Sequence, residues 1–145
     1  MQTISEFMAA DHARCDQLYA DGESELLAGN FEEGRENMTA FDLGMRRHFE
    51  MEEEILFPAF EQATGMTQGP TMVMRAEHTQ MNAILEQMEE ALESGDTDTI
   101  LGAGETLLMM MQQHNMKEEG MLYPMADQHL AEQAANLIQR MREVE

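Results

Sequence analysis

Four of the five histidines in this chain, together with two glutamates, follow one pattern that occurs twice, 66 residues apart. Each copy has a histidine, a second histidine 36 residues later, a glutamate four residues after that, and then a proline. The members are His12, His48, Glu52 and Pro58, and then His78, His114, Glu118 and Pro124. Imidazole and carboxylate ligands suit iron, manganese or zinc rather than calcium or magnesium. The doubled pattern predicts one metal site shared by two matching halves.

The elements that position these residues are expected to be helices, because helix formers dominate the chain and strand markers are scarce. A first helix is expected to start at a cap on Thr3 or Ser5 and to end near residues 27–28. The others are expected near residues 31–58, 71–93 and 98–124, with a connector over 64–70 and a short fifth helix over 125–145. Pro58 is expected to kink or stop its helix, because proline removes one backbone hydrogen bond.

The length of each predicted hairpin brings its two histidines to the same level. From His12 to Leu27 the chain rises about 22 Å, and from Phe31 back to His48 it descends about 26 Å. The second copy has the same spacing, and short turns make paired helices antiparallel. We therefore predict an all-α, up-down-up-down four-helix bundle with all four histidines in one layer. Residues 1–145 form a single domain in this prediction, with repeats at about 5–60 and 71–126.

Within that layer, each glutamate lies one helical turn from its histidine and on the same face. We interpret the set as two metal ions, each held by two histidines, bridged by Glu52 and Glu118. A buried carboxylate without such a partner would be costly. His129 lies outside the pattern, so we expect it on the surface. No residue is assigned a catalytic role.

The series His12, His48-x-x-x-Glu52, His78 and His114-x-x-x-Glu118 resembles the hemerythrin family, specifically its hemerythrin-like HHE cation-binding domain. The match runs from Ser5 to Pro124, and each His-x-x-x-Glu motif is followed by Phe-Pro or Tyr-Pro. The resemblance implies a non-haem di-iron centre with an oxo or hydroxo bridge, with iron ahead of manganese or zinc. It also implies reaction with dioxygen, nitric oxide or peroxide.

The chain departs from oxygen-carrying hemerythrins, which have two histidines four residues apart on the third helix. Here Met74 lies four residues before His78, and Asn82 four residues after it. The last carboxylate of those carriers is five residues after its histidine, which would be Glu119, whereas the internal repeat favours Glu118. The missing histidine argues against stable oxygen carriage and leaves open positions, as a reactive or sensing site needs.

Several buried side chains have two readings. Met8, Met45, Met74 and Met111 each lie three or four residues before a patterned histidine and should line the interior beside the metals. They are either ordinary core filler or a soft, apolar pocket for a diatomic molecule. Cys15, the only cysteine, is either a small buried residue or a redox or ligand group.

The charge and composition exclude some partners. A formal net charge of −21 opposes nucleic acid and anionic membrane surfaces. No apolar run is long enough to span a membrane, and the N-terminus lacks a secretory pattern. A single cysteine agrees with a reducing cytoplasm. We expect a cytoplasmic monomer or weak homo-oligomer.

Two classes of function follow from these observations and the resemblance. The first is a protein that binds or senses dioxygen or nitric oxide. The alternative is a di-iron enzyme with peroxidase-like, catalase-like or oxidase activity, or one that acts on nitric oxide, or an iron-handling or stress-repair protein. We favour a metal- and oxygen-binding protein over an enzyme.

Overall fold

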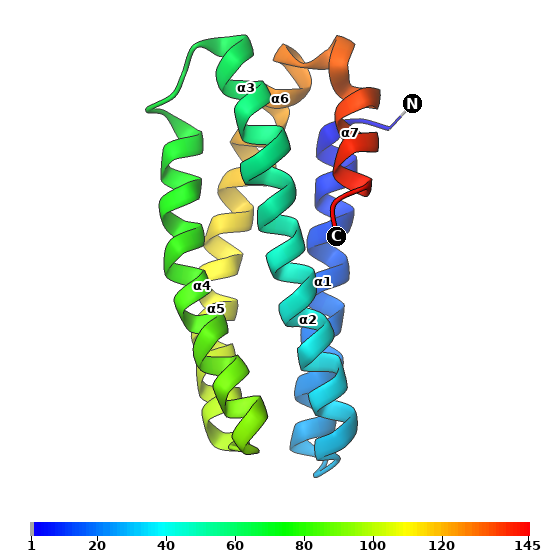
Figure 1. Cartoon of the computed structure of the whole chain (residues 1–145), viewed down its shortest axis with the longest axis vertical. Coiled ribbons are helices and arrows are strands. Elements are labelled where there is room, and N and C mark those ends of the chain that lie inside the picture. Colours follow the sequence, from blue (N-terminus) through cyan, green and yellow to red (C-terminus); the bar gives the residue numbers. More distant parts are fainter. Residues whose placement is uncertain (1) are drawn as a thin grey trace.

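The computed structural model describes residues 2–145, and Figure 1 shows these residues as a bundle of long helices. Its four long helices are α1 (Ile4–Leu27), α2 (Phe31–Met51), α4 (Pro70–Ser94) and α5 (Thr97–Lys117). Helix α1 packs along α2, and α4 packs along α5, so the predicted bundle is confirmed. Residues 2–145 contain no strand, and none of their helices is long and apolar enough to cross a membrane.

The two hairpin turns are built in the same way. Gly29 and Gly95 occupy equivalent positions of the repeat, and both have a positive φ, 86° and 75°. Glycine has no Cβ, so it adopts this left-handed conformation without steric cost. The next amide donates back into each helix, from Asn30 to the Glu25 carbonyl and from Asp96 to the Ala91 carbonyl. These bonds end the helices and reverse the chain within a few residues.

The N-terminus of α1 is capped by Thr3, one of the two expected candidates. The Thr3 hydroxyl accepts a hydrogen bond from the Glu6 amide, and the Glu6 carboxylate accepts one from the Thr3 amide. This capping box satisfies two amides that the first turn leaves unpaired. The Ser5 amide instead donates to the Asp127 carboxylate at 3.1 Å, which joins α1 to the far end of the chain.

Neither proline stops its helix, so a stop, one of the two outcomes expected at Pro58, is wrong. Each lies just beyond a π-helical segment, η1 (Glu52–Leu56) or η2 (Glu118–Leu122). The chain then continues as α3 (Phe57–Thr64) after η1 and as α6 (Tyr123–His129) after η2. A π-helical turn holds one extra residue, with bonds from residue i+5 to residue i. The wider turn accommodates the missing amide and the ring, so the helix passes through the proline.

The C-terminal segment forms more than the one short helix expected over residues 125–145. Helix α6 ends at His129, the 3-10 helix η3 (Ala131–Gln133) follows, and α7 (Ala134–Arg142) then runs back toward α1. Arg47 of α2 donates hydrogen bonds to the carbonyls of Val144 and Arg142. Figure 1 shows α7, α3, α6 and the N-terminus at the same end of the bundle.

Two hydrophobic clusters fill the bundle, one toward each end. The terminal cluster lies at the end with α3, α6 and α7, and includes Ile4, Met8, Met51, Phe57, Met74, Tyr123 and Leu137. The turn cluster lies toward the hairpin turns, and includes Cys15, Tyr19, Phe41, Met45, Leu85, Leu107 and Met111. The patterned histidines and glutamates are buried but belong to neither cluster. A polar layer therefore divides the core.

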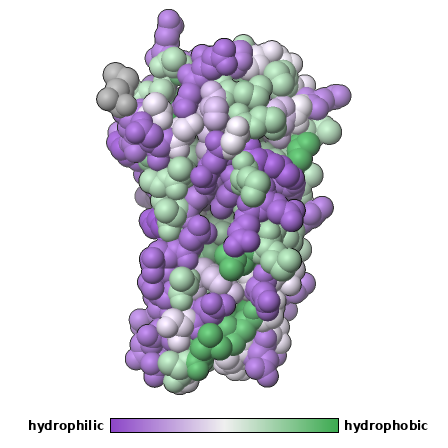
Figure 2. All heavy atoms as spheres, turned by 180° about the vertical axis from the view of Figure 1, so that it is seen from behind, coloured by the Kyte–Doolittle hydropathy of each residue, from purple (hydrophilic) through white to green (hydrophobic). Residues whose placement is uncertain are grey.

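The outside of the bundle is largely polar. Figure 2 shows the molecule from behind, with hydrophilic atoms over most of this face and the most hydrophobic atoms mainly near the turn end. This distribution agrees with 29 acidic residues against 8 lysines and arginines in the chain. Polar groups are expected on the surface, so it is the buried histidines and glutamates of the interior layer that need an explanation.

Candidate metal centre

The six residues of the repeated pattern meet inside the bundle. Each histidine comes from a different long helix, and each glutamate is the first residue of a π-helical segment. They are His12 on α1, His48 on α2, His78 on α4, His114 on α5, Glu52 on η1 and Glu118 on η2. All six are buried, with exposed fractions of 6% or less. The hairpin lengths thus bring the side chains to one level, as expected.

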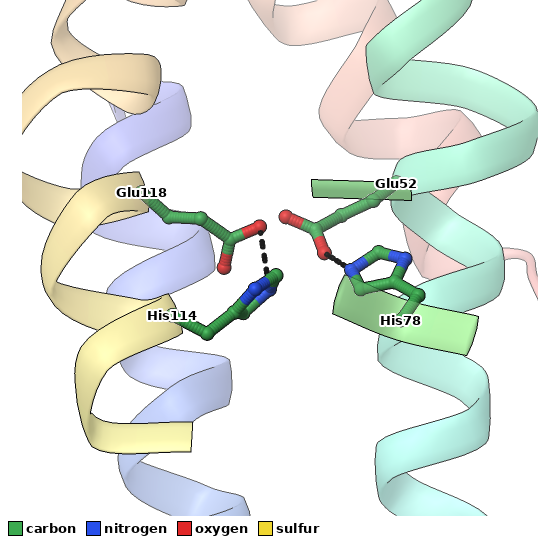
Figure 3. Close-up of side chains that lie close together, drawn as sticks. All are labelled: Glu52, His78, His114 and Glu118. Carbon is green, nitrogen blue, oxygen red and sulfur yellow. Dashed lines mark ion pairs between the residues drawn. The ribbon is translucent and has the colours of Figure 1, made fainter. Parts of the chain in front are cut away.

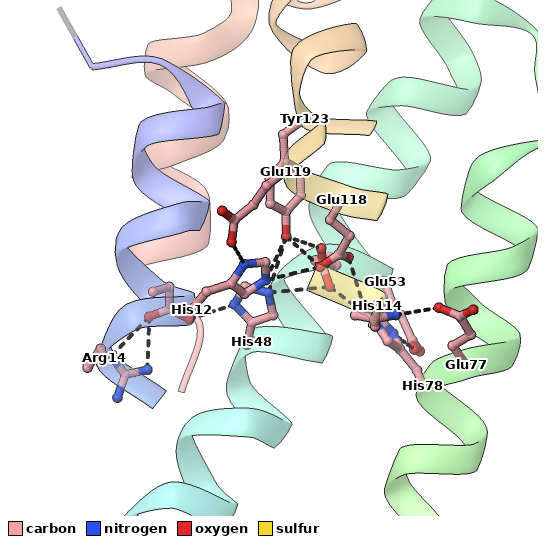
Figure 4. A network of polar contacts seen from close by, with 12 residues as sticks. His12, Arg14, His48, Glu53, Glu77, His78, His114, Glu118, Glu119 and Tyr123 are labelled. Atoms are coloured by element: carbon pink, nitrogen blue, oxygen red, sulfur yellow. Dashed lines mark hydrogen bonds and ion pairs between the residues drawn. The ribbon is translucent and has the colours of Figure 1, made fainter. Parts of the chain in front are cut away.

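Each glutamate spans the two halves of the chain, as Figures 3 and 4 show in part. The oxygen–nitrogen distances are 3.0 and 3.2 Å from Glu118 to His12 and His114, and 3.1 and 3.5 Å from Glu52 to His78 and His48. The rings of His12 and His48 are 4.6 Å apart between centroids, and those of His78 and His114 are 5.0 Å apart. His12 and His48 therefore form one pair, and His78 and His114 form the other. Each carboxylate lies close to one histidine of each pair.

Four atoms of this layer are buried without a hydrogen-bond partner among residues 2–145. They are Glu52 Oε1, His78 Nε2, His114 Nε2 and Glu118 Oε2. Some of these atoms lie about 3 Å from one another, but the geometry between them is not that of a hydrogen bond. Each buried, unpaired polar group costs about 1–3 kcal/mol. These four residues offer ligand atoms within 4.8 Å of one another, as do His12, His48 and Glu118. The donor set therefore fits metal ions, which would satisfy the unpaired atoms.

Four carboxylates outside the layer fix the orientation of the histidines. Each imidazole Nδ1 lies 2.6–2.8 Å from a carboxylate oxygen. The pairs are His12 with Glu119, His48 with Asp11, His78 with Glu53, and His114 with Glu77. When Nδ1–H donates outward, the Nε2 lone pair of a neutral imidazole points to the interior, where a metal could bind it.

Sequence reasoning missed three of these four carboxylates, although the repeat contains them. Asp11 and Glu77 occupy equivalent positions, as do Glu53 and Glu119. Glu119, the alternative to Glu118, lies outside the layer, where its side chain is 45% exposed and bonds His12 Nδ1. Glu118 is fully buried and faces the interior. The geometry therefore favours Glu118 as the inner carboxylate.

Tyr123 is a further member of the layer that the sequence did not single out. Its hydroxyl donates to Glu52 Oε2 at 2.6 Å and also lies 2.9 Å from Glu118 Oε1. The same oxygen is 3.2 and 3.4 Å from the Nε2 atoms of His12 and His48. On an α-helix, a residue five positions after Glu118 points away from it. In the π-helical segment, the Tyr123 amide bonds the Glu118 carbonyl, which stacks the two residues on one face.

The two inner carboxylates differ in their affinity for a proton. Burial, followed by the charge of Glu118, raises the pKa of Glu52. Burial also acts on Glu118, but hydrogen bonds from Glu52, His114 and His12 outweigh it and lower the pKa of that carboxyl. For His12, burial acts in the opposite direction and disfavours the protonated form, yet the hydrogen bond to Glu118 raises the pKa of the imidazole to about 9. Glu118 is thus held in its negatively charged form, which suits cation binding, whereas burial lowers the pKa of His48 and favours its neutral form.

Apolar side chains enclose the layer. The ring of Phe49 stacks on His78 with centroids 4.1 Å apart, and Phe57 stacks on the same imidazole at 5.7 Å. Among the expected methionines, Met8 and Met74 belong to the terminal cluster, while Met45 and Met111 belong to the turn cluster. All four are buried, as interior-lining residues should be.

Two other residues lie outside the centre. Cys15 is 1% exposed in the turn cluster and belongs to neither group of potential metal ligands. Burial raises the pKa of its thiol to about 12, which keeps the sulfur protonated at neutral pH. His129 is exposed at the end of α6, where its ring meets Phe60 edge-on. Its surface position agrees with the sequence-based expectation.

Comparison with known proteins gives one finding that covers most of the chain. Residues 3–126 match the family model described as the hemerythrin HHE cation binding domain. No curated protein and no solved structure matches the chain. The family match spans the bundle and the whole histidine–glutamate layer, and it ends within α6. The chain therefore belongs to the hemerythrin HHE cation-binding domain family.

Proposed function

We propose that this protein is a non-haem di-iron protein that binds or senses dioxygen, or a related small molecule such as nitric oxide. The observation that carries the proposal is the bridging geometry. Each of two buried glutamates faces one histidine from each pair, with four inward atoms unpartnered. The proposed ligands are His12, His48, Glu52, His78, His114 and Glu118.

Iron is favoured by the donor set and by the family. Nitrogen and carboxylate ligands suit iron, and the family binds cations. When bound, iron would supply electrons that dioxygen can accept and return. The protein's part is to hold the ions through imidazole Nε2 atoms, to bridge them with Glu52 and Glu118, and to fix the rings through the outer carboxylates.

The size of the adjoining space favours a small ligand. A cavity of about 100 Å³ lies between α4 and α5 and is lined by His114, Glu77, Met81, Met110, Lys117 and two glutamines. A space of this size beside His114 is sufficient for a diatomic molecule. Phe49 and Phe57 cover the adjacent His78, whose side chain is fully buried.

A second candidate is an enzyme that acts on peroxide or nitric oxide at the same centre. The two positions four residues from His78 that could hold the additional histidine of oxygen carriers are occupied by Met74 and Asn82, and Met74 is 1% exposed within the terminal cluster. Fewer nitrogen ligands leave more positions for exogenous groups, and open metal positions permit turnover. Reversible binding and turnover can be separated by experiment.

The test is metal analysis combined with oxygen exposure. Protein loaded with ferrous iron without air should hold two irons per chain and develop a visible absorption band when air is admitted. A band that disappears when oxygen is removed supports binding or sensing, whereas irreversible oxidation with peroxide consumption supports the enzyme. Fewer than one iron per chain and no band would rule out the di-iron proposal.

A matched pair of variants tests the site itself. Glu52→Ala removes a bridging carboxylate and should abolish iron binding. His129→Ala removes the one histidine outside the layer and should leave the iron content unchanged, because that ring is exposed and belongs to neither group of potential metal ligands. Circular dichroism must show that both variants are folded. Normal iron content in folded Glu52→Ala would contradict the bridge assignment.

A further inference from the structure

One of the pairs of equivalent positions that differ between the two halves of the centre lies directly after the π-helical segments. Tyr123 follows η2 directly, and its counterpart in the first copy, Phe57, follows η1 directly. Both side chains are fully buried, and both backbone amides close a π-helical turn on the inner glutamate. The same local structure thus places a hydroxyl group in one half and a bare ring in the other.

The hydroxyl lies on the side of one histidine pair. Its oxygen is 3.2 Å from His12 Nε2 and 3.4 Å from His48 Nε2, while neither nitrogen of the other pair is among its partners. It also contacts one oxygen of each inner glutamate, at 2.6 and 2.9 Å. The oxygen is therefore in contact with the nitrogens of only one of the two proposed metal positions.

The other half has no such group and borders open space. Phe57 and Phe49 lie against His78 with nearly parallel rings, at interplanar angles of 19° and 22°. His114, the partner of His78, lines the cavity of about 100 Å³ between α4 and α5. None of the cavity-lining residues belongs to the His12 and His48 pair. This cavity therefore lies beside the half that lacks the hydroxyl, and we take that half as the one that a small molecule approaches.

We propose that Tyr123 makes the two metal positions inequivalent: its phenolic oxygen is a seventh protein donor on the His12 and His48 half, and small exogenous ligands bind on the His78 and His114 half. The proposal rests on the di-iron function proposed above. Tyr123 would supply an additional donor, as an additional histidine does in oxygen carriers. The donor would lie at the metal position of His12 and His48, whereas Met74 lies on α4 together with His78 of the other position.

The chemistry is simple. When the phenol binds a ferric ion, its O–H bond breaks, both electrons stay on oxygen, and the proton leaves to solvent. The oxygen then donates a lone pair to the metal, and no other bond changes. Tyrosinate bound to ferric iron absorbs visible light and gives characteristic ring vibrations in resonance Raman spectra, so the bond has a signature that does not depend on activity.

Three proteins test the donor: the natural chain, Tyr123→Phe and Tyr19→Phe. The chain has two tyrosines, and Tyr19 is also buried but bonds only Glu23, at 3.3 Å, so it is the matched control. Each protein is loaded with iron, oxidised and measured for iron content and Raman spectrum. We expect two irons per chain in all three, with tyrosinate vibrations in the natural chain and Tyr19→Phe but not in Tyr123→Phe.

Azide, a small anionic ligand of ferric iron, tests the second part. The natural protein should bind one azide per chain, and Tyr123→Phe should bind two, because the variant frees the position on the His12 and His48 half. Filling the cavity with Met110→Phe should slow azide binding, while Met109→Phe, at a neighbouring residue that is 62% exposed, should not.

The outcomes separate this inference from the proposed function. Two irons per chain without tyrosinate vibrations would overturn the donor role and leave the di-iron proposal intact. Equal azide stoichiometry in the natural chain and Tyr123→Phe would overturn the inequivalence. Failure to bind iron would overturn the proposed function, and the inference would fall with it.

Discussion

Removing the carboxylate of Asp11 should weaken the binding of one metal ion and leave the other nearly unchanged. Asp11 Oδ2 lies 2.7 Å from His48 Nδ1, and Oδ1 accepts two hydrogen bonds from Arg14 at 2.9 and 3.0 Å. The carboxylate is therefore held on one side by the guanidinium and holds the imidazole on the other. Without it, His48 loses both its fixed orientation and part of its basicity.

The size of the expected loss of metal affinity depends on how firmly the contact between Asp11 and His48 is held. Loss of a group that hydrogen-bonds a metal ligand typically costs about 10–100-fold in metal affinity, or about 1.4–2.8 kcal/mol. Asp11 is 9% exposed and locked by Arg14, so Asp11→Ala should lie near the upper end, about 100-fold. Asp11→Asn keeps an acceptor but loses the charge, so about tenfold is expected.

The equivalent carboxylate, Glu77, should act on the other metal position. It bonds His114 Nδ1 at 2.8 Å, but its side chain is 22% exposed and also pairs with Lys117. Solvent can replace part of this contact, so Glu77→Ala should cost about tenfold. The two variants should weaken different binding steps, and the double variant should weaken both.

Competition with a coloured chelator resolves the two binding steps in each protein. Asp42→Ala is the control, because Asp42 is also a buried aspartate paired with an arginine, Arg46, but contacts no histidine. Its metal affinity should match that of the natural chain. Unchanged affinity in Asp11→Ala, or an equal loss at both steps, would refute the pairing of histidines deduced from the structure.

Three further results are expected. Removing the metal should lower the melting temperature, because saturation at 100 times the dissociation constant contributes about 2.7 kcal/mol, or roughly 9 °C for 145 residues; equal melting of both forms would speak against binding to the folded state. Native Cys15 should resist a chromogenic disulfide until the protein unfolds, because burial and the nearby Asp11 raise the pKa of its thiol to about 12; rapid reaction of folded protein would contradict its burial. Gly29→Ala should destabilise by about 1–2 kcal/mol in urea, because φ is 86° there, whereas Gly102→Ala, exposed within α5, should stabilise by about 1 kcal/mol; a neutral Gly29→Ala would remove the strain argument.

The bundle and the position of the inner layer could be predicted because each depends on distances along the chain. Gly29 and Gly95 set where the hairpins turn, and the spacing of 36 residues then fixes which residues return to one level. A helix advances by a constant rise, so sequence number converts directly to height in the bundle. The choice of Glu118 over Glu119 also followed from the repeat, and the geometry favours it.

Tyr123 and the outer carboxylates could not be placed in the same way, for two different reasons. Tyr123 was hidden because the prediction assumed α-helical geometry through Pro124, and a π-helical turn changes which residues share a face. The outer pairs cross between helices: Asp11 on α1 reaches His48 on α2, and Glu53 on η1 reaches His78 on α4. Such contacts depend on how the helices are rotated about their axes, which spacing along one helix does not determine.

The internal repeat provides a way to separate scaffold from function within a single chain. Where the copies agree, as at Gly29 and Gly95 or at the two π-helical segments, the shared feature serves turn geometry and ligand placement in both halves. A site with matching halves would treat its two metal positions alike. The copies differ inside the layer, where Tyr123 replaces Phe57 and contacts one histidine pair only. Under the proposed di-iron function, this difference would distinguish the two metal positions chemically, so the non-matching residues are where selectivity for a ligand should be sought.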